Sequence, residues 1–147
     1  MTARKATATP DTSVVVAGLC SWHPSHGPAR AALQRRPPVI AHVLFESYSV
    51  LTRLPPQQRL APEIVRDALL STFSGEPLQL ATQHVRSLID LVGANGLGGG
   101  ATYDALVAAS ALHAGLRLQS LDGRARLTYA TVGVDVDWLG GEIGSSR

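Results

Sequence analysis

Short apolar segments alternate with longer helical ones along nearly the whole chain, and this alternation limits the possible folds more than any other feature. The strand candidates are residues 6–10, 39–41, 78–81, 116–121 and 132–136. The helix candidates are residues 28–34, 42–54, 61–73, 83–91 and 103–114. Strands that alternate with helices at this spacing indicate a parallel sheet with helices on both faces. The sequence therefore predicts an α/β protein.

Turn-forming residues mark most of the boundaries between these segments. A proline pair directly after residue 54 closes the long helix before it, because proline lacks the N–H that a helix interior needs. Thr102 is placed to cap the helix that follows it, and Gly115 ends that helix. The apolar run 14–20 fits either a short helix or a continued strand. Residues 93–100 are glycine-rich and predict a flexible loop.

The length of 147 residues predicts one domain, residues 1–147, with residues 1–5 disordered. Apolar residues make up 45% of the chain and aromatic residues only 5%, so we expect a core built mainly from Ala, Val and Leu. The one cysteine, Cys20, excludes an intramolecular disulfide and a thiolate zinc cluster. The apolar run 14–19 is shorter than the roughly 7–15 residues of a signal-peptide core and far shorter than a membrane span. We therefore expect neither export nor membrane insertion, and a cytoplasmic protein.

Asp104 is the most informative residue of the chain. Its helical neighbours at i+3, i+4, i+7 and i+8 are apolar: Val107, Ala108, Ala111 and Leu112. This spacing places the carboxylate in line with the apolar stripe of the helix. Burying a carboxylate without a partner costs several kcal/mol or shifts its pKa until the group is neutral. A simpler explanation is that an acid in a first turn complements the helix dipole by roughly 0.3–1 kcal/mol.

Glu46 repeats this pattern on the predicted helix 42–54. Val43 and Val50 flank it at i−3 and i+4. The main buried face of this helix is expected to contain four apolar residues: Leu44, Phe45, Tyr48 and Leu51. A glutamate that borders this face can reach the edge of the sheet, whereas a surface glutamate paired with Arg53 is the alternative.

Asp11 and Asp122 each come directly after a predicted strand. Ligands of open α/β sheets bind outside the carboxyl ends of the strands, so both acids are expected at that edge. Each also has a simpler explanation, since Asp11 fits a helix N-cap and Asp122 fits a turn before Gly123. Together with Glu46 and Asp104, they are four acids on four different elements that would converge on one edge.

Four adjacent carboxylates repel one another and stay ionised together only around a cation. Oxygen ligands alone favour a hard metal, Mg²⁺ or Mn²⁺, over zinc. Such a metal can activate a water and neutralise charge on a phosphodiester. The charge balance is compatible with this, because 11 − 4 = 7 remaining acids against 13 Lys and Arg leave +6 for the rest of the molecule. An acidic pocket in a basic surface suits an enzyme that acts on a polyanion, although an ordinary basic protein has the same balance.

Four segments of the sequence together resemble the PIN domain, and more narrowly the VapC-type toxins of bacterial VapBC toxin–antitoxin pairs. They are residues 11–17 (Asp-Thr-Ser-Val-Val-Val-Ala), Glu46 within the helix 44–54, residues 104–111 (Asp-Ala-Leu-Val-Ala-Ala-Ser-Ala) and residues 120–122 (Ser-Leu-Asp). The segments follow one another in the order of the family over nearly the whole chain.

The resemblance implies a PIN-like three-layer α/β/α fold with a short central parallel sheet. It also implies a Mg²⁺-dependent endoribonuclease that hydrolyses RNA phosphodiester bonds, with Mn²⁺ as a substitute metal. The implied catalytic and metal-binding site has four acids and two supporting hydroxyls: Asp11, Glu46, Asp104 and Asp122, with Ser13 and Ser120. Asp11 and Asp104 would be the principal ligands. The implied assembly is a homodimer, held inactive by a cognate VapB-type antitoxin encoded beside it.

Two positions depart from the family pattern. The strand before Asp11 is only weakly apolar, and Gly123 separates Asp122 from Arg124, where a basic residue usually follows directly. Two other functions stay open. One is a catalytically silent PIN-like module that only binds RNA or a protein. The other is a different Mg²⁺-dependent α/β phosphoesterase with Asp11 as nucleophile, although that chemistry would want an acid where Ser13 stands.

Overall fold

A three-stranded parallel sheet lies at the centre of the molecule. The computed structural model describes residues 6–140, so the disorder predicted for residues 1–5 lies outside the described residues. The strands are β1 (Ala8–Pro10), β2 (Arg117–Ser120) and β3 (Val136–Trp138), in the order β1-β2-β3. Thr9 pairs with Leu118, which in turn pairs with Val136, so β2 is the central strand. The predicted parallel α/β architecture is confirmed.

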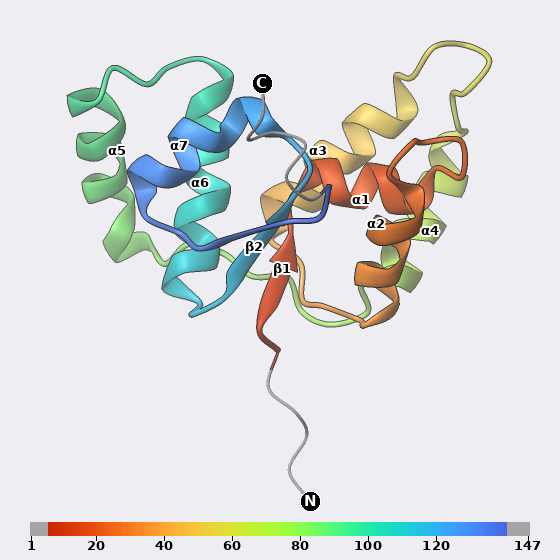
Figure 1. The fold of residues 1–147 in the computed structure, drawn as a ribbon, viewed down its shortest axis with the longest axis horizontal. Helices are drawn as coiled ribbons and strands as arrows, with labels where there is room; N and C mark the ends of the chain where they lie inside the picture. The colour runs from red at the N-terminus through yellow and green to blue at the C-terminus, as the bar shows by residue number, and fades with distance from the viewer. Residues whose placement is uncertain (1–5, 141–147) are drawn as a thin grey trace, which may run out of the picture.

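Helices cover the sheet on two sides (Figure 1). Those to its right in the view are α1 (Thr12–Leu19), α2 (His26–Gln34), α3 (Ala41–Thr52) and α4 (Pro62–Thr72). Those to its left are α5 (Val85–Ala94), α6 (Gly100–His113) and α7 (Arg126–Val132). Two short 3-10 turns, η1 (Thr82–His84) and η2 (Gly123–Ala125), precede α5 and α7. No helix within residues 6–140 has the length and apolarity needed to cross a membrane.

The core consists mainly of small aliphatic side chains, as the composition predicts. The largest fully buried apolar residues come from several elements: Val14, Val15, Val39, Ile40, Val43, Leu51, Val65 and Leu118. The weakly apolar β1 is compatible with this core because buried Thr9 is satisfied, its Oγ1 donating to the backbone carbonyl of Pro38 at 2.8 Å. The run 14–20 is helical, because Asp11 caps α1 and directs Val14 and Val15 into the core.

Two predicted strands are wrong. Residues 39–41 and 78–81 contribute only an isolated parallel bridge between Ile40 and Leu78. The backbone N–H of Leu78 donates to Val39, and that of Ala41 donates to Leu78, both at 2.8 Å. The pairing stops there because Ala41 already begins α3, and because the preceding Pro38 has no N–H to give a ladder.

The strand predicted at 132–136 is displaced, and the helix before it was not predicted. Residues 126–132 form α7, which Gly133 ends in the left-handed conformation at φ 93°, and β3 starts only at Val136. Thr102 is not a cap, because α6 begins at Gly100 and Gly99 occupies the N-cap position with φ 57°.

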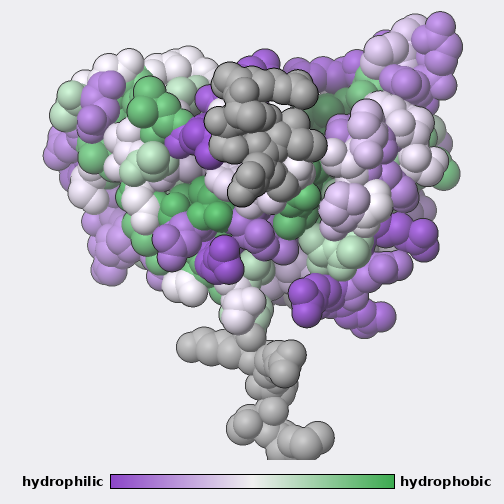
Figure 2. Space-filling model, viewed as in Figure 1, coloured by the Kyte–Doolittle hydropathy of each residue, from purple (hydrophilic) through white to green (hydrophobic). Residues whose placement is uncertain are grey.

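Apolar side chains remain exposed on several helices. On the face shown in Figure 2 they are interspersed with hydrophilic residues, and the loop between α3 and α4 projects as a hydrophilic lobe at the upper right. The most exposed large apolar residues are Phe45, Ile64, Leu70, Ile89, Tyr103 and Leu127, each more than half exposed.

Candidate active site

Asp11 joins the sheet to the first helix. It follows β1 directly, and its backbone N–H donates to the carbonyl of Gln119 at 2.9 Å, which extends the pairing with β2 by one residue. Its extended backbone (φ −85°, ψ 179°) places the side chain over the start of α1, where it accepts from the N–H of Val14 at 3.3 Å. The residue is 3% exposed. The N-cap position considered for Asp11 is confirmed, and its carboxylate is buried at the end of β1.

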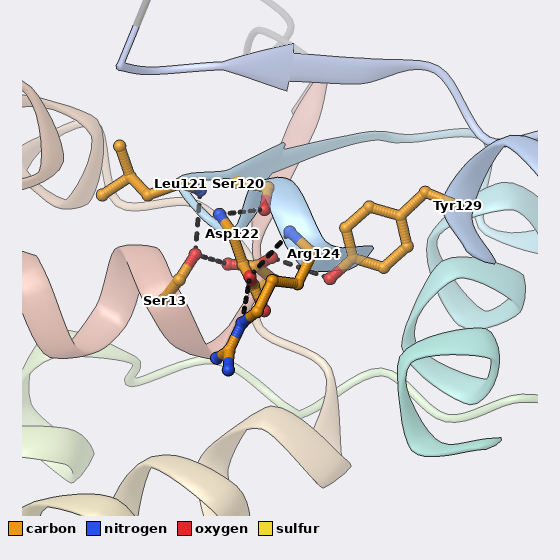
Figure 3. Close-up of polar contacts among 7 residues, drawn as sticks. Ser13, Ser120, Leu121, Asp122, Arg124 and Tyr129 are labelled. Carbon is orange, nitrogen blue, oxygen red and sulfur yellow. Dashed lines mark hydrogen bonds and ion pairs between the residues drawn. The ribbon is translucent and has the colours of Figure 1, made fainter. Parts of the chain in front are cut away.

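Two serine hydroxyls form hydrogen bonds at the end of β2, and the one from Ser13 links α1 to it (Figure 3). Ser13 Oγ donates to Asp11 Oδ1 and accepts from the backbone N–H of Leu121 at 2.8 Å. Ser120 is fully buried, and its Oγ accepts from the N–H of Asp122 at 3.0 Å. Burial raises the pKa of the Asp11 carboxyl, and the nearby hydroxyls of Ser120 and Ser13 oppose that rise. The two serines predicted as supporting groups thus lie beside the predicted acids.

Tyr129 is a site residue that the sequence reading missed. Its Oη donates to Asp11 Oδ2 at 2.8 Å, and its side chain is 2% exposed. Burial and the charge of Asp11 raise the pKa of Tyr129, so the phenol stays a hydrogen-bond donor. In Figure 3, Tyr129 and Ser13 lie on opposite sides of residues 120–122. No local pattern could have revealed this contact, because 118 residues separate the two partners.

Asp104 lies on the inner side of α6, as its spacing predicts. Val107, Ala108 and Ala111 on the same stripe are buried, and only Leu112 at its end is exposed. The pKa of the Asp104 carboxyl is raised to about 6. Burial is the largest cause, and the negative charges of Asp122, Glu46 and Asp11 add to it, in that order. Asp104 is therefore close enough to the other three predicted acids for their charges to act on it.

Glu46 borders the buried face of α3, but that face differs from the predicted one. The buried residues are Val43, Ser47 and Leu51, whereas Phe45 is 79% exposed and Tyr48 is 38% exposed. Val43, Ser47 and Leu51 recur every four residues, so they form one stripe that turns Phe45 to the outside. The carboxylate of Glu46 lies 3.6 Å from the Nε2 atom of His42, one turn earlier on the helix.

Asp122 begins the 3-10 turn that follows β2. It accepts from the backbone N–H of Arg124 at 3.1 Å and from the Arg124 Nε atom at 3.4 Å. The Arg124 side chain is 94% exposed, so its guanidinium stands in solvent beside the acids. Its positive charge opposes the rise in the pKa of Asp104. Although Gly123 interrupts the family spacing, this arginine still reaches the site.

The four acids fit a hard cation by their chemistry rather than by a preformed geometry. Within residues 6–140 no three ligating side chains converge as a ready metal site. Glu46, Asp104 and Asp122 are each partly exposed and can reorient. Asp11 Oδ1 already accepts from Ser13 and Val14, whereas Asp11 Oδ2 accepts from Tyr129 and has a further lone pair. Burial is the main cause of the raised pKa of Asp104, and the negative charges of the other three acids add to it. A bound divalent cation would relieve this repulsion.

Tyr129→Phe is expected to lower the free energy of unfolding by about 1–3 kcal/mol, because the buried Asp11 carboxyl loses a donor that water cannot replace. Denaturant unfolding of both proteins measures the difference. Tyr48→Phe, at a partly exposed tyrosine of α3, is the control and should change stability by less than about 0.5 kcal/mol. Equal losses in the two variants would mean that the Asp11 hydrogen bond contributes nothing specific.

Comparison with known proteins gives the same family for most of the chain. The model of the PIN domain matches residues 8–130. Ribonuclease VapC40 of Mycobacterium tuberculosis is 46% identical over 128 residues, which cover 87% of this chain and 96% of the relative. Ribonuclease VapC27 of the same species is 39% identical over 127 residues, which cover 86% of this chain and 92% of the relative.

Proposed function

The chain belongs to the PIN-domain family and is similar along most of its length to VapC ribonucleases, and from this premise we propose that it is a metal-dependent endoribonuclease, the toxin of a VapBC-type pair. The observation that supports the proposal is that three acids on other elements, Asp11, Glu46 and Asp122, act electrostatically on the partly buried Asp104. The proposed metal is Mg²⁺, with Mn²⁺ as a substitute.

Each residue of the site has a proposed role. Asp11 and Asp104 would be the principal metal ligands, with Glu46 and Asp122 completing the set. When bound, the metal would supply an activated water and neutralise charge on the phosphodiester. Ser13 and Tyr129 hold the Asp11 carboxyl in one orientation through hydrogen bonds to its two oxygens. The exposed Arg124 guanidinium is placed to bind a phosphate oxygen of the RNA.

The proposal is tested by incubating the purified protein with total RNA and mapping new 5′ ends. New ends at defined positions are expected. Binding without new ends would favour the catalytically silent module, which the presence of all four interacting acids disfavours. Hydrolysis of a small phosphate ester without RNA cleavage would favour another phosphoesterase. That alternative is weakened because Ser13, which stands where a second acid would be needed, instead donates to Asp11.

We further propose a homodimer that binds a VapB-type antitoxin over α3 and α4. Val43 and Leu51 of α3 belong to the core and are not available to a partner. The apolar side chains left for a partner on these helices are Phe45, Tyr48, Ile64 and Leu70. The cytoplasmic location and the single domain over residues 1–147 remain predictions.

Phe45→Asp is expected to reduce the amount of the adjacent gene product that co-purifies by about tenfold or more, because it places a charge in an apolar contact. Leu127→Asp, at a similarly exposed apolar residue of α7, is the control and should leave co-purification unchanged. Equal yields from wild type and Phe45→Asp would move the antitoxin surface away from α3. Light scattering that gives a monomer at micromolar concentration would contradict the dimer.

A further inference from the structure

Two aromatic rings from different helices stack beside the four acids. His42 in the first turn of α3 and Tyr103 in the first turns of α6 have ring planes only 1° apart, with centroids separated by 5.1 Å. Each ring is close in sequence to an acid of the site. His42 lies one helical turn before Glu46, and Tyr103 directly precedes Asp104. The stack therefore joins the two helices at the edge of the acid cluster.

In this stack the His42 ring is held in place, whereas the Tyr103 ring is open to solvent. His42 is fixed from two directions, since its ring lies on Tyr103 and its Nε2 atom, buried and without a hydrogen bond within residues 6–140, lies 3.6 Å from a Glu46 oxygen. Tyr103, in contrast, is 53% exposed. The Tyr103 ring packs on a second ring, so its side chain is already ordered before a ligand binds. Stacking of a ligand on Tyr103 therefore costs little further side-chain entropy.

We propose that Tyr103, supported by His42, is the stacking surface for a nucleobase of the single-stranded RNA next to the phosphate to be cut. The inference rests on the proposed ribonuclease function. The acids repel the RNA backbone, so an attraction that does not depend on charge would strengthen binding near them, in addition to the phosphate contact proposed for Arg124. Stacking of bases on aromatic rings provides it and tolerates different base identities. The position of Tyr103 beside Asp104 places such a base adjacent to the reacting phosphate.

The test uses a short single-stranded RNA that carries the fluorescent base 2-aminopurine at each position in turn, titrated with the protein in EDTA so that no cleavage occurs. Wild type should quench one position through stacking. Tyr103→Leu should abolish this quenching and weaken binding by roughly 5- to 150-fold. Tyr103→Phe and Tyr103→Trp keep an aromatic face and should retain both. Trp22→Leu, which removes an aromatic residue of similar exposure (48%) elsewhere on the surface, should behave as wild type.

Quenching and affinity that are unchanged in Tyr103→Leu would overturn the proposal and leave the stack as a structural link between α3 and α6. Loss of quenching in Tyr103→Trp would also overturn it, because that variant keeps the aromatic face. A parallel cleavage assay in Mg²⁺ separates this failure from failure of the function. If wild type cuts RNA without quenching any position, the stacking surface is wrong and the ribonuclease stands. If wild type cuts no RNA, the proposed function itself fails.

Discussion

Asp104→Asn is expected to abolish RNA cleavage while leaving the metal-free protein as stable as wild type or more stable. The amide is nearly isosteric with the acid, so packing against Val107, Ala108 and Ala111 should survive. What disappears is one of four interacting negative charges, together with a proposed metal ligand. A residue needed only for the fold would show the opposite pattern, because its loss would lower stability whether or not a metal is present.

The stability of the metal-free wild-type protein should decrease as the pH rises, because Asp104 becomes ionised. The pKa of Asp104 rises from 3.8 to about 6 on folding, so the folded protein binds this proton more tightly than the unfolded chain. The ionised form of Asp104 lowers the free energy of unfolding. This loss is absent below about pH 4, increases between about pH 4 and pH 6, and reaches its full size above about pH 6. The shift corresponds to at most about 3 kcal/mol, and partial exposure of the group reduces the expected value to about 1 kcal/mol. The mutant should lack this loss of stability between pH 4 and pH 7.

Thermal melts in EDTA and in several millimolar Mg²⁺ measure both effects. Wild type should gain about 2.7 kcal/mol when the metal is at a hundred times its dissociation constant, and the mutant should gain much less. Asp90→Asn, at an exposed acid of α5, is the control and should keep both cleavage and the Mg²⁺ response. If Asp104→Asn melts well below wild type in EDTA, the residue is structural. If both proteins respond equally to Mg²⁺, Asp104 is not a ligand.

Local chemistry was sufficient to predict the elements that lie near the acids. The proline pair after residue 54 and Gly115 each end a helix through local backbone effects. The two helices that they end, α3 and α6, were predicted nearly correctly. The position of Asp104 in line with the buried stripe of α6 followed from the spacing of a single helix. These features depend on neighbours only a few residues away, which is the range over which a sequence pattern carries information.

Features that depend on distant partners were predicted poorly. The apolar run before Val136 was assigned to a strand, although Gly133 in the left-handed conformation separates a helix from β3 there. The buried face of α3 was placed too far toward Phe45, because composition alone cannot show which side of a helix meets the sheet. The contact between Tyr129 and Asp11 depends on the complete topology and has no local signature.

Cleavage should stop completely in EDTA and return on addition of Mg²⁺ or Mn²⁺, with products that carry a 5′-phosphate and a 3′-hydroxyl. The four acids offer only oxygen ligands, which suit these cations and water activation by them. The metal-free alternative attacks through the RNA 2′-hydroxyl and leaves a cyclic phosphate. It requires a base and an acid on either side of the phosphate, most often histidines.

Three of the five histidines, His42, His84 and His113, are poorly arranged for that alternative. His42 stacks on Tyr103 with its Nε2 atom buried near Glu46, so it faces the protein rather than a substrate. His84 and His113 stack on each other with centroids 3.7 Å apart, which joins η1 to the last turn of α6, far along that helix from Asp104. The measurement is ligation of the new 5′ ends without prior phosphorylation, at matched EDTA and Mg²⁺ concentrations. Equal cleavage in EDTA, or cyclic phosphate ends in either condition, would rule out the metal mechanism, and with it the assignment of the four acids as ligands.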